Sequence, residues 1–365
     1  MKLLVFPRND GPYQRLLYAQ MRQRGVQVRY LGEVTRSQTL NVLLLPLETV
    51  RWRLRGARFI HIHWVYVFML PGATKFPVLR WSAQLWFVLW LYTCRLLAMH
   101  IVWTAHNVLP HERVFADDAR ARRALVKATA LLVAHSSSAL DELAAFGAVP
   151  GYSTIIQHGP IEPTRPAESL RVPGSDEGPR RFLFLGRVQE YKGVEGLLNS
   201  FAALPSEVNA QLLVAGQCGD PSLEGRLRRL AEMSGERVEV RFEYIPDEEV
   251  THLLSVADVV VLPYRRITTS GSVMLALSHG RPLIVPRLPG LAELPDEAVC
   301  RYDGSDKGLT EAIIILSEVD KGSLEAMSAA ALKYSSGITW WEMAEIMLTE
   351  MNSLLSNKRR AMPSL

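Results

Sequence analysis

The sequence predicts an α/β protein of two Rossmann-like domains whose parallel sheets face a central cleft. The first observation is the length, because 365 residues exceed what one hydrophobic core usually holds. The second is the alternation, in both halves, of short apolar runs with helical patterns, as in βαβ units. The third is a segment rich in proline, glycine and charge at 159–181, which is typical of a linker.

Apolar runs of strand length occupy the amino-terminal half. They lie at 2–6, 26–31, 58–64, 100–105, 130–135 and 153–158, with helical patterns between them such as 13–24 and 137–146. The carboxyl-terminal half repeats the alternation. Its strands are expected at 182–186, 210–216, 238–245, 258–264, 282–286 and 298–302, and its helices at 193–203, 247–257 and 307–319. We therefore expect domains at 1–165 and 181–335, and a final helix within 336–365 that returns to the first domain.

The composition excludes some classes of protein. With 41 Lys and Arg against 37 Asp and Glu, the net charge is only +4 and the pI is near 9.0. This small excess favours phosphate-bearing ligands or acidic membranes. No basic run is interleaved with aromatic residues, so we do not expect nucleic acid as a partner. The cysteines, Cys94, Cys218 and Cys300, show no disulfide or metal spacing, which fits a reducing cytoplasm.

The segment 76–103 is the candidate for membrane contact. Its longest uncharged run, 81–94, is shorter than the about 20 residues that a membrane-spanning helix needs. It is either a buried helix or a helix lying in a membrane face. In the second case its aromatic residues would lie at the headgroups and its flanking arginines would reach out of the apolar layer. These residues are Trp81, Trp86, Trp90 and Tyr92, flanked by Arg80 and Arg95.

Two loops of the carboxyl-terminal half have the features of anion sites. In the first, Arg187 and Lys192 precede a helix that begins near Gly193. Fixed positive charge and a helix amino terminus both attract phosphate, although a solvated basic loop is the alternative.

The second loop contains a Thr-Ser-Gly-Ser turn. Ser270, Gly271 and Ser272 precede a helix from Val273, so hydroxyl and N–H donors converge on one point. A simple helix cap is the alternative. Because both loops follow strands of one domain, two anion sites at one cleft would fit a diphosphate.

The segments GRVQEYKGVEGLL, ADVVVLPY and SGSVMLALSHGRPLIVP resemble the donor half of glycosyltransferases with the GT-B fold, in particular the family-4-like superfamily. The resemblance implies that Arg187 and Lys192 hold the diphosphate of a nucleotide sugar and that the turn 270–273 grips the same group. It also implies that Tyr244 and Ile245 edge the base. Retaining members carry two glutamates around this turn, whereas this chain has Ile267 and Leu275. The absence of these glutamates argues against a retaining reaction. It also leaves no expected partner for the ribose, which one of the two glutamates binds in those members.

The segments FIHIHWVY, VWTAHNVLPHE and PRNDGPYQRLLYAQM resemble bacterial exopolysaccharide glycosyltransferases, notably the xanthan-type β-mannosyltransferases. This resemblance implies an inverting transfer of mannose from GDP-mannose to a lipid-linked saccharide. The enzyme would be cytoplasmic and peripheral on the inner face of the plasma membrane. The residues expected on the acceptor side or in the cleft are Asn9, Gly11, Tyr13, His63, Asn107 and His158.

An inverting transfer needs a general base with a pKa near neutrality for the acceptor hydroxyl. His106 follows the strand 100–105, and His111 and Glu112 lie just beyond Pro110. We expect one of these three residues to be the base, with Glu112 or His111 ahead of His106. Glu112 also suits an early helical position for purely structural reasons.

His61 and His63 alternate with isoleucines and therefore share one face of a strand. Lining of the core or of the cleft is the favoured interpretation, because a zinc pair lacks a third ligand in the sequence.

No metal and no other cofactor is expected. Metal-dependent transferases use an Asp-x-Asp pattern, whereas the adjacent Asp117 and Asp118 read as a helix start. The charge of the leaving diphosphate would fall to Arg187 and Lys192.

Three alternatives remain beside this interpretation. A dehydrogenase or epimerase is disfavoured because FPRNDGPYQ after the first strand lacks G-x-G-x-x-G and no Tyr-x-x-x-Lys pair occurs. The other two are a non-catalytic glycosyltransferase-like subunit and a retaining transferase that uses a UDP-sugar.

Overall fold

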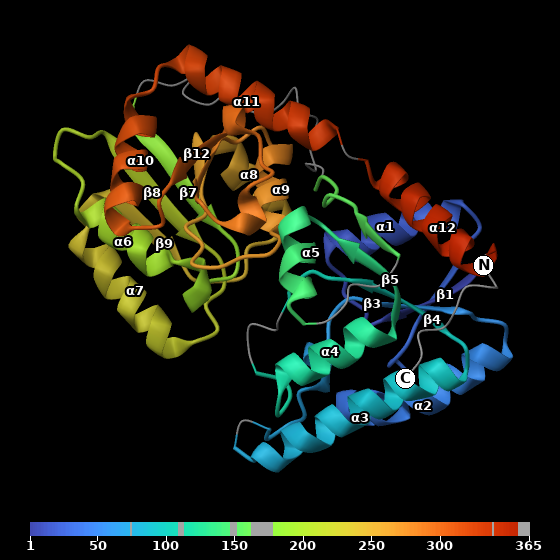
Figure 1. The fold of residues 1–365 in the computed structure, drawn as a ribbon. Helices are drawn as coiled ribbons and strands as arrows, with labels where there is room; N and C mark the ends of the chain where they lie inside the picture. Colours follow the sequence, from blue (N-terminus) through green and yellow to red (C-terminus); the bar gives the residue numbers. More distant parts are fainter. Residues whose placement is uncertain (74, 109–112, 147–151, 162–177, 338, 357–365) are drawn as a thin grey trace. The chain divides into compact units, whose positions relative to one another are not determined.

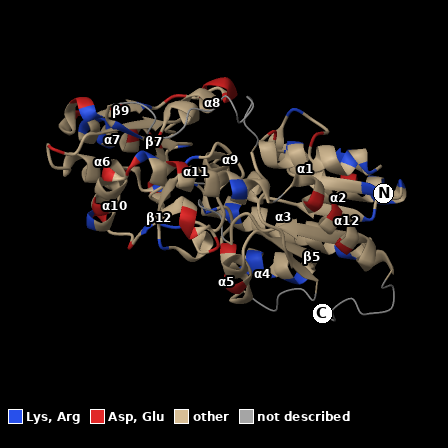
Figure 2. Cartoon of the chain, turned by 90° about the horizontal axis from the view of Figure 1, so that it is seen from above, with Lys and Arg blue, Asp and Glu red and all other residues tan. Residues whose placement is uncertain are grey.

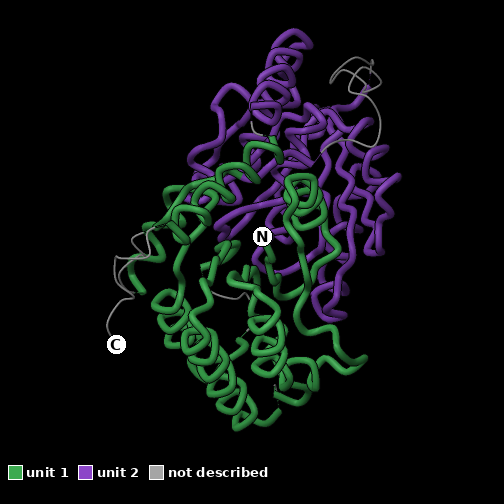
Figure 3. The backbone as a smooth tube through the Cα atoms, turned by 90° about the vertical axis from the view of Figure 1, so that its right-hand side faces the viewer, with its two compact units in different colours: residues 1–157, 339–365 green, residues 158–338 purple. Residues whose placement is uncertain are grey.

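A computed structural model of the chain describes residues 1–73, 75–108, 113–146, 152–161, 178–337 and 339–356 (Figure 1). The chain forms two compact units, which Figure 3 shows in different colours. Unit 1 comprises residues 1–157 and 339–365, and unit 2 comprises residues 158–338. Unit 2 is therefore inserted, in sequence, into unit 1.

Unit 1 contains a parallel sheet with the strand order β2-β1-β3-β4-β5-β6. Its strands are β1 (Lys2–Phe6), β2 (Gln27–Tyr30), β3 (Phe59–Ile62), β4 (His100–Thr104), β5 (Thr129–Ala134) and β6 (Ser153–Ile155). Its α-helices are α1 (Pro12–Gln23), α2 (Gln38–Leu54), α3 (Pro77–Leu96), α4 (Asp118–Ala128), α5 (Ser137–Ala144) and α12 (Trp340–Ser356). Helices α1 and α12 lie together on one face, and α2, α3 and α4 cover the other (Figure 1).

The central strands of this sheet are apolar because helices bury both of their faces. The face toward α2 and α3 is packed with large side chains, and Trp90 and Trp103 are almost fully buried there. The indole N–H of Trp90 donates to Thr49 Oγ1 of α2 at 3.0 Å, so its one polar group is satisfied inside the core. Trp90 therefore cannot lie at the headgroup level of a membrane, which corrects that part of the interfacial-helix interpretation.

Helix α3 is half buried and half exposed. Phe87, Trp90 and Cys94 face the core, whereas Trp81, Leu85 and Tyr92 are exposed on the opposite side. Within the residues that the structure describes, no helix is both long and apolar enough to cross a membrane.

Unit 2 contains a second parallel sheet, with the order β12-β11-β10-β7-β8-β9. Its strands are β7 (Arg180–Leu185), β8 (Ala210–Ala215), β9 (Val238–Arg241), β10 (Val259–Val261), β11 (Leu283–Pro286) and β12 (Val299–Tyr302). Its α-helices are α6 (Val194–Ala202), α7 (Pro221–Met233), α8 (Asp247–Val256), α9 (Gly271–Ser278), α10 (Asp306–Glu318) and α11 (Lys321–Ser336), and a 3₁₀ turn, η3, covers Glu190–Lys192.

Each sheet has one place where the direction of strand order reverses. In unit 1 this place lies between β1 and β3, and in unit 2 it lies between β7 and β10. At such a point the loops that follow the two strands turn to opposite faces of the sheet, which opens a crevice at their carboxyl ends. The predicted α/β fold of two parallel sheets is confirmed, although β9 and β10 end earlier than the apolar runs suggested.

Candidate active site

The two predicted anion loops follow β7 and β10 and meet at Gly186. A Cβ atom added to Gly186 would lie 3.1 Å from Lys192 Nζ and also 3.1 Å from Ser272 Oγ. The ammonium group of the first loop and the hydroxyl group of the second therefore lie at the same backbone position, at the reversal point of the sheet. This geometry brings together the cation and the hydroxyl that the sequence had placed in separate loops.

Main-chain contacts hold the two loops against each other. The N–H of Arg265 donates to the carbonyl oxygen of Tyr191 at 2.8 Å, which ties η3 to the segment after β10. Gly193, which ends η3, has φ +71°, and a Cβ there would come within 1.9 Å of the carbonyl oxygen of Pro263. Only glycine allows both this left-handed conformation and this approach.

Two hydroxyl groups fix the start of α9. The Tyr264 hydroxyl is 2.8 Å from Ser270 Oγ, which in turn accepts from the N–H of Val273 at 3.3 Å. Ser270 thus caps α9, as the structural alternative expected. The cap leaves the N–H groups of the first helical turn directed outward, where the helix dipole attracts an anion.

Positive charge accumulates at this point without a matching carboxylate. Within the described residues, Arg187 and Lys192 have no ion pair and no hydrogen bond to an acidic side chain. Burial, and next the neighbouring Arg187, lower the pKa of Lys192 to about 8. Arg266 is close enough to affect Tyr191, as Arg187 does. A site that holds uncompensated cations is built for an anionic ligand.

Arg266 was missed from the sequence. It stands in the pair Arg265-Arg266 in the loop that follows β10, and its position near the Thr-Ser-Gly-Ser turn was the signal that could have found it.

The glutamate positions of retaining relatives are apolar in structure as well as in sequence. Ile267 and Leu275 pack against the core of unit 2. Of the pair expected near the base, Ile245 is buried and Tyr244 is 72% exposed, so only the Tyr244 ring is accessible to a ligand. None of these four residues has a carboxylate that could bind the ribose of a nucleotide.

The reversal point of unit 1 holds a cluster of buried histidines. The Tyr18 hydroxyl lies 2.7 Å from His61 Nδ1 and 2.5 Å from His63 Nε2. His61 Nε2 lies 2.7 Å from Thr104 Oγ1, and His63 Nδ1 lies 2.9 Å from His106 Nε2. Hydrogen bonds thus occupy the ring nitrogens that a zinc ion would need, which agrees with the lining role preferred for His61 and His63.

Aromatic rings enclose His106 in this cluster. Trp64 stacks on it with ring centroids 4.5 Å apart, and Tyr13 meets it edge-on at 4.7 Å. His135 from the end of β5 lies 5.3 Å away. Burial lowers the pKa of His61 to about 3 and that of His63 also falls, so these two rings are neutral near pH 7.

The remaining expected residues have separate positions. Asn9 Oδ1 accepts from the N–H of Gly11 at 2.8 Å and shapes the turn before α1, and Tyr13 packs between the histidines and Trp340. His158, at the start of unit 2, bonds to the carbonyl oxygen of Gly159 at 2.8 Å. Asn107 is half-buried and follows His106.

Two of the three candidate bases, His111 and Glu112, lie outside the described residues.

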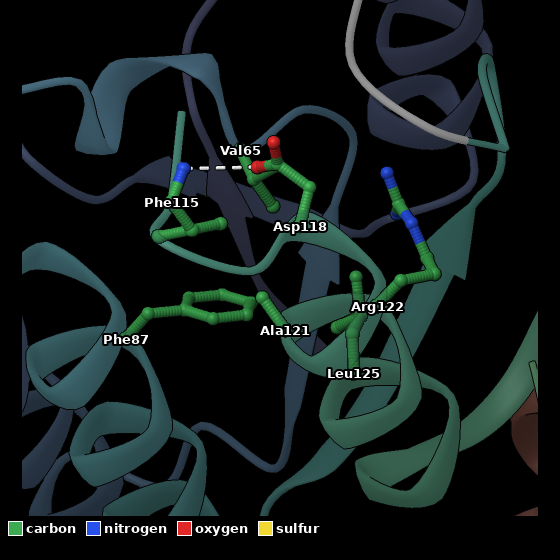
Figure 4. Close-up of a pocket in the computed structure, with 7 residues that line it drawn as sticks. All are labelled: Val65, Phe87, Phe115, Asp118, Ala121, Arg122 and Leu125. Atoms are coloured by element: carbon green, nitrogen blue, oxygen red, sulfur yellow. Dashed lines mark hydrogen bonds between the residues drawn. The ribbon is translucent and has the colours of Figure 1, made fainter. Parts of the chain in front are cut away.

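The adjacent aspartates at 117 and 118 have structural partners. Asp117 caps α4 by accepting from the N–H of Arg120 at 2.8 Å. Asp118 accepts from the N–H of Phe115 at 2.9 Å, at the side of a small apolar hollow under α4 (Figure 4). In the same view Arg122 points away from the hollow, and its guanidinium lies 4.7 Å from the Trp103 ring.

Comparison with known proteins places this site in a family. The model of the family described as glycosyl transferases group 1 matches residues 179–318, which contain both anion loops. A GDP-mannose:glycolipid 4-beta-D-mannosyltransferase of Xanthomonas campestris pv. campestris is 27% identical over 259 residues, which is 67% of each chain. A D-inositol 3-phosphate glycosyltransferase of Thermobifida fusca is 27% identical over 321 residues, covering 83% of this chain and 71% of the relative.

Among solved structures, HepE of Anabaena in complex with UDP and glucose superposes with a TM-score of 0.70 at 13% identity, covering 97% of this chain and all of the other. Residues 179–318 thus form a glycosyl transferases group 1 domain, and the protein is a glycosyltransferase with the GT-B fold.

Proposed function

We propose that this glycosyltransferase moves mannose from GDP-mannose to a lipid-linked saccharide with inversion at the anomeric carbon and without a divalent metal. The transfer would serve bacterial surface polysaccharide synthesis. The observation that carries the proposal is the meeting of Lys192 and Ser272 at Gly186. The name of the Xanthomonas relative supports GDP-mannose as donor and a glycolipid as acceptor.

The donor's diphosphate fits the charge at the reversal point of unit 2. Arg187 and Lys192 lack acidic partners among the described residues, and the first turn of α9 adds N–H donors. These groups would stabilise the negative charge that develops on the diphosphate as the sugar leaves. Because they are already in place, they do so without reorganisation, and removing one such donor typically costs about 10²–10³ in kcat. This is the role that a metal ion has in metal-dependent transferases.

The residues at the two glutamate positions support inversion. Ile267 and Leu275 are packed apolar residues and cannot act as a nucleophile or stabilise a charged intermediate. A single displacement then needs a base on the acceptor side, for which His106, His111 and Glu112 are the candidates. Of these, the structure describes His106.

The donor is tested by adding GDP, UDP, ADP and TDP to the purified protein and measuring the thermal midpoint. We expect GDP to raise it most, since a ligand at a hundred times its Kd stabilises a fold by about 2.7 kcal/mol. Transfer from GDP-mannose should persist in excess EDTA and give a product of inverted anomeric configuration. Arg187→Ala should lower kcat by about 10²–10³, while Arg229→Ala, an exposed arginine of α7, serves as the control.

A larger shift with UDP would replace GDP-mannose by a UDP-sugar, as the UDP-bound relative suggests. Retention of configuration, or activity restored after EDTA by Mg²⁺ or Mn²⁺, would refute inversion or metal independence respectively.

Peripheral attachment to the membrane is supported by an exposed apolar surface on unit 1, here called the α2/α3 face. Its residues are apolar or aromatic, are exposed to solvent and lie on two adjacent helices. They are Leu40, Leu43, Leu47 and Leu54 of α2 and Val78, Trp81, Leu85, Leu89, Tyr92 and Leu96 of α3. The helices are locked side by side, since Trp86 Nε1 of α3 donates to the carbonyl oxygen of Val42 at 2.9 Å.

The charge of the α2/α3 face matches an anionic bilayer. Helix α3 has Arg80 and Arg95 as its charged residues and carries no acidic one. Figure 2 shows the charged residues of the chain in blue and red. Helix α2 ends with Arg51 and Arg53, followed by Arg55. An apolar surface bounded by arginines binds anionic headgroups weakly and reversibly.

We expect the protein to float with vesicles of anionic lipid at low salt and to dissociate at high salt. The double variant Leu47→Asp, Leu85→Asp should reduce bound protein at least tenfold, because it places charge where the acyl region would be. Ile315→Asp, a matched change at an exposed residue of α10 in unit 2, should bind as the wild type does. Equal flotation of all three proteins would show that this face does not touch the membrane.

The pKa of Lys192 gives a second test of the anion site. Holding this cation in a buried place costs folding free energy, so Lys192→Met should raise the free energy of unfolding at pH 7 and weaken GDP binding about tenfold or more. From pH 8 to the ordinary pKa of 10.5 the unfolded chain binds the proton and the folded chain does not. The free energy of unfolding of the wild type therefore gains a positive slope with pH in that window, which the variant lacks.

Urea unfolding at pH 7, 9 and 10, with and without GDP, measures both effects. Lys307→Met is the control, since the Lys307 side chain is 88% exposed and its ammonium group pairs with Glu311 at the surface. A Lys192→Met protein that is less stable and binds GDP normally would contradict this role.

A further inference from the structure

Two arginines are buried in the part of the chain that the structure describes, Arg281 of unit 2 and Arg122 of unit 1. Arg281 has acceptors for its donors, since its Nε donates to the carbonyl oxygen of His279 and its Nη1 to that of Ala257, both at 2.9 Å. Arg122 is only 6% exposed, yet its guanidinium has no hydrogen-bond acceptor and no ion pair among the described residues. Arg122 therefore has donors that this part of the protein leaves unused.

The guanidinium of Arg122 lies near the carboxyl edge of the unit 1 sheet. It is 4.7 Å from the ring of Trp103, which is the last residue but one of β4. Figure 4 shows the side chain pointing away from the apolar hollow under α4. Its Nε is sealed from solvent, whereas its two terminal nitrogens are not. Ligands of doubly wound sheets bind at this edge, and the terminal nitrogens can be reached from solvent there.

No carboxylate among the described residues pairs with the charge of Arg122. Burial lowers the pKa of Arg122 to about 10, and Asp118, one turn earlier on α4, raises it by less, so the guanidinium is charged near pH 7. The Asp118 carboxylate is itself occupied, because it accepts from the N–H of Phe115 at 2.9 Å and from that of Val114 at 3.2 Å. A buried charge without a counter-ion costs folding free energy, which the face of the Trp103 ring offsets only in part.

We propose that Arg122 binds an oxyanion of the acceptor, either a carboxylate of an acidic sugar or a phosphate. Its two accessible terminal nitrogens would donate in parallel to two oxygens of that group, a geometry that carboxylates and phosphates both match. The inference rests on the proposed function, because it assigns this anion to the saccharide acceptor of the transfer. It adds that this acceptor is negatively charged.

Packing on Trp103 alone is the competing explanation, since the stem of an arginine also covers apolar surface. The two explanations differ in how the guanidinium responds to an added anion. An arginine that only packs would not respond. The adjacent Arg123 offers a matched comparison, because it lies on the same helix and carries the same charge but is exposed.

The experiment uses the full-length protein with arginine labelled with ¹⁵N at Nε. The sealed Nε–H of Arg122 should exchange slowly with water and give a resolved resonance, which Arg122→Lys identifies by its absence. Glucuronate, glucose 1-phosphate and glucose serve as matched probes that carry a carboxylate, a phosphate or no charge. We expect an anionic probe to shift the Arg122 resonance saturably and glucose to leave it in place. A stronger response to glucuronate would assign the anion to an acidic sugar, and a stronger response to glucose 1-phosphate to a phosphate.

The thermal midpoint gives a second measurement. It is recorded in the Lys192→Met protein, so that the anion site of unit 2 contributes little. Adding Arg122→Met should weaken binding of the anionic probe about tenfold or more, whereas adding Arg123→Met should leave it unchanged. Arg122→Lys keeps the charge without the planar fork and should also weaken binding, which protects the test against an Arg122→Met protein that fails to fold.

The proposal is overturned if neither anion shifts the Arg122 resonance, or if the Arg122 and Arg123 variants bind the anions equally well. Neither result touches the proposed function, which is decided by transfer from GDP-mannose. If no donor supports transfer, the proposed function fails, while the titration still decides whether Arg122 binds an oxyanion.

Discussion

Hydrogen bonding between β7 and β10 determines where chemistry can occur in unit 2. Because these two strands are neighbours and their connections leave toward opposite faces of the sheet, the segments that follow them must separate at the carboxyl edge. Lys192 reaches this edge from one segment and Ser272 from the other. Glycine is needed at Gly186 and Gly193 because the two segments approach so closely that a side chain would crowd Lys192 and Ser272 or strike a carbonyl group. In unit 1 the same reversal, between β1 and β3, collects the histidines.

The reversal points of the two units, each taken by itself, solve opposite electrostatic problems. Unit 2 leaves cations without carboxylate partners in a partly buried place, and the lowered pKa of Lys192 records that cost. Unit 1 contains several titratable rings, yet burial keeps His61 and His63 neutral and every hydrogen bond among them is made within the protein. The proposed binding of an anion would therefore stabilise unit 2, whereas Tyr18, His61 and His63 of unit 1 already have hydrogen-bond partners within the protein.

Short stretches of sequence were enough to predict the strands and the two candidate anion loops, because neighbouring residues determine these features. Buried parallel strands read as apolar runs, and loops beside helix starts read as anion sites, so both sheets and the segments around Arg187 and Ser270 could be predicted from the sequence. The histidine cluster could not, because Tyr18 and His63 are 45 positions apart and their contact depends on how α1 packs on the sheet. Helix α3 shows the same limit. Its composition suggested either a buried helix or a helix lying in a membrane face. Packing against α2 buries one side of the helix, with Trp90, and leaves the other side, with Trp81, exposed.

The chain order of the units has a consequence for how such proteins can be recombined. Helix α12 follows unit 2 in sequence and returns to α1, where Trp340 packs on Tyr13 and the Arg24 guanidinium lies 4.6 Å from the Trp341 ring. Because Tyr13 also contacts His63 and His106, the last helix supports a ring that packs against the histidines. The unit proposed to bind the donor is thus an interior cassette with its two junctions near residues 157 and 338, and the flanking sequences belong together. Exchange of that cassette between related enzymes would leave unit 1 whole, whereas a single crossover near residue 157 would separate α12 from the unit it completes.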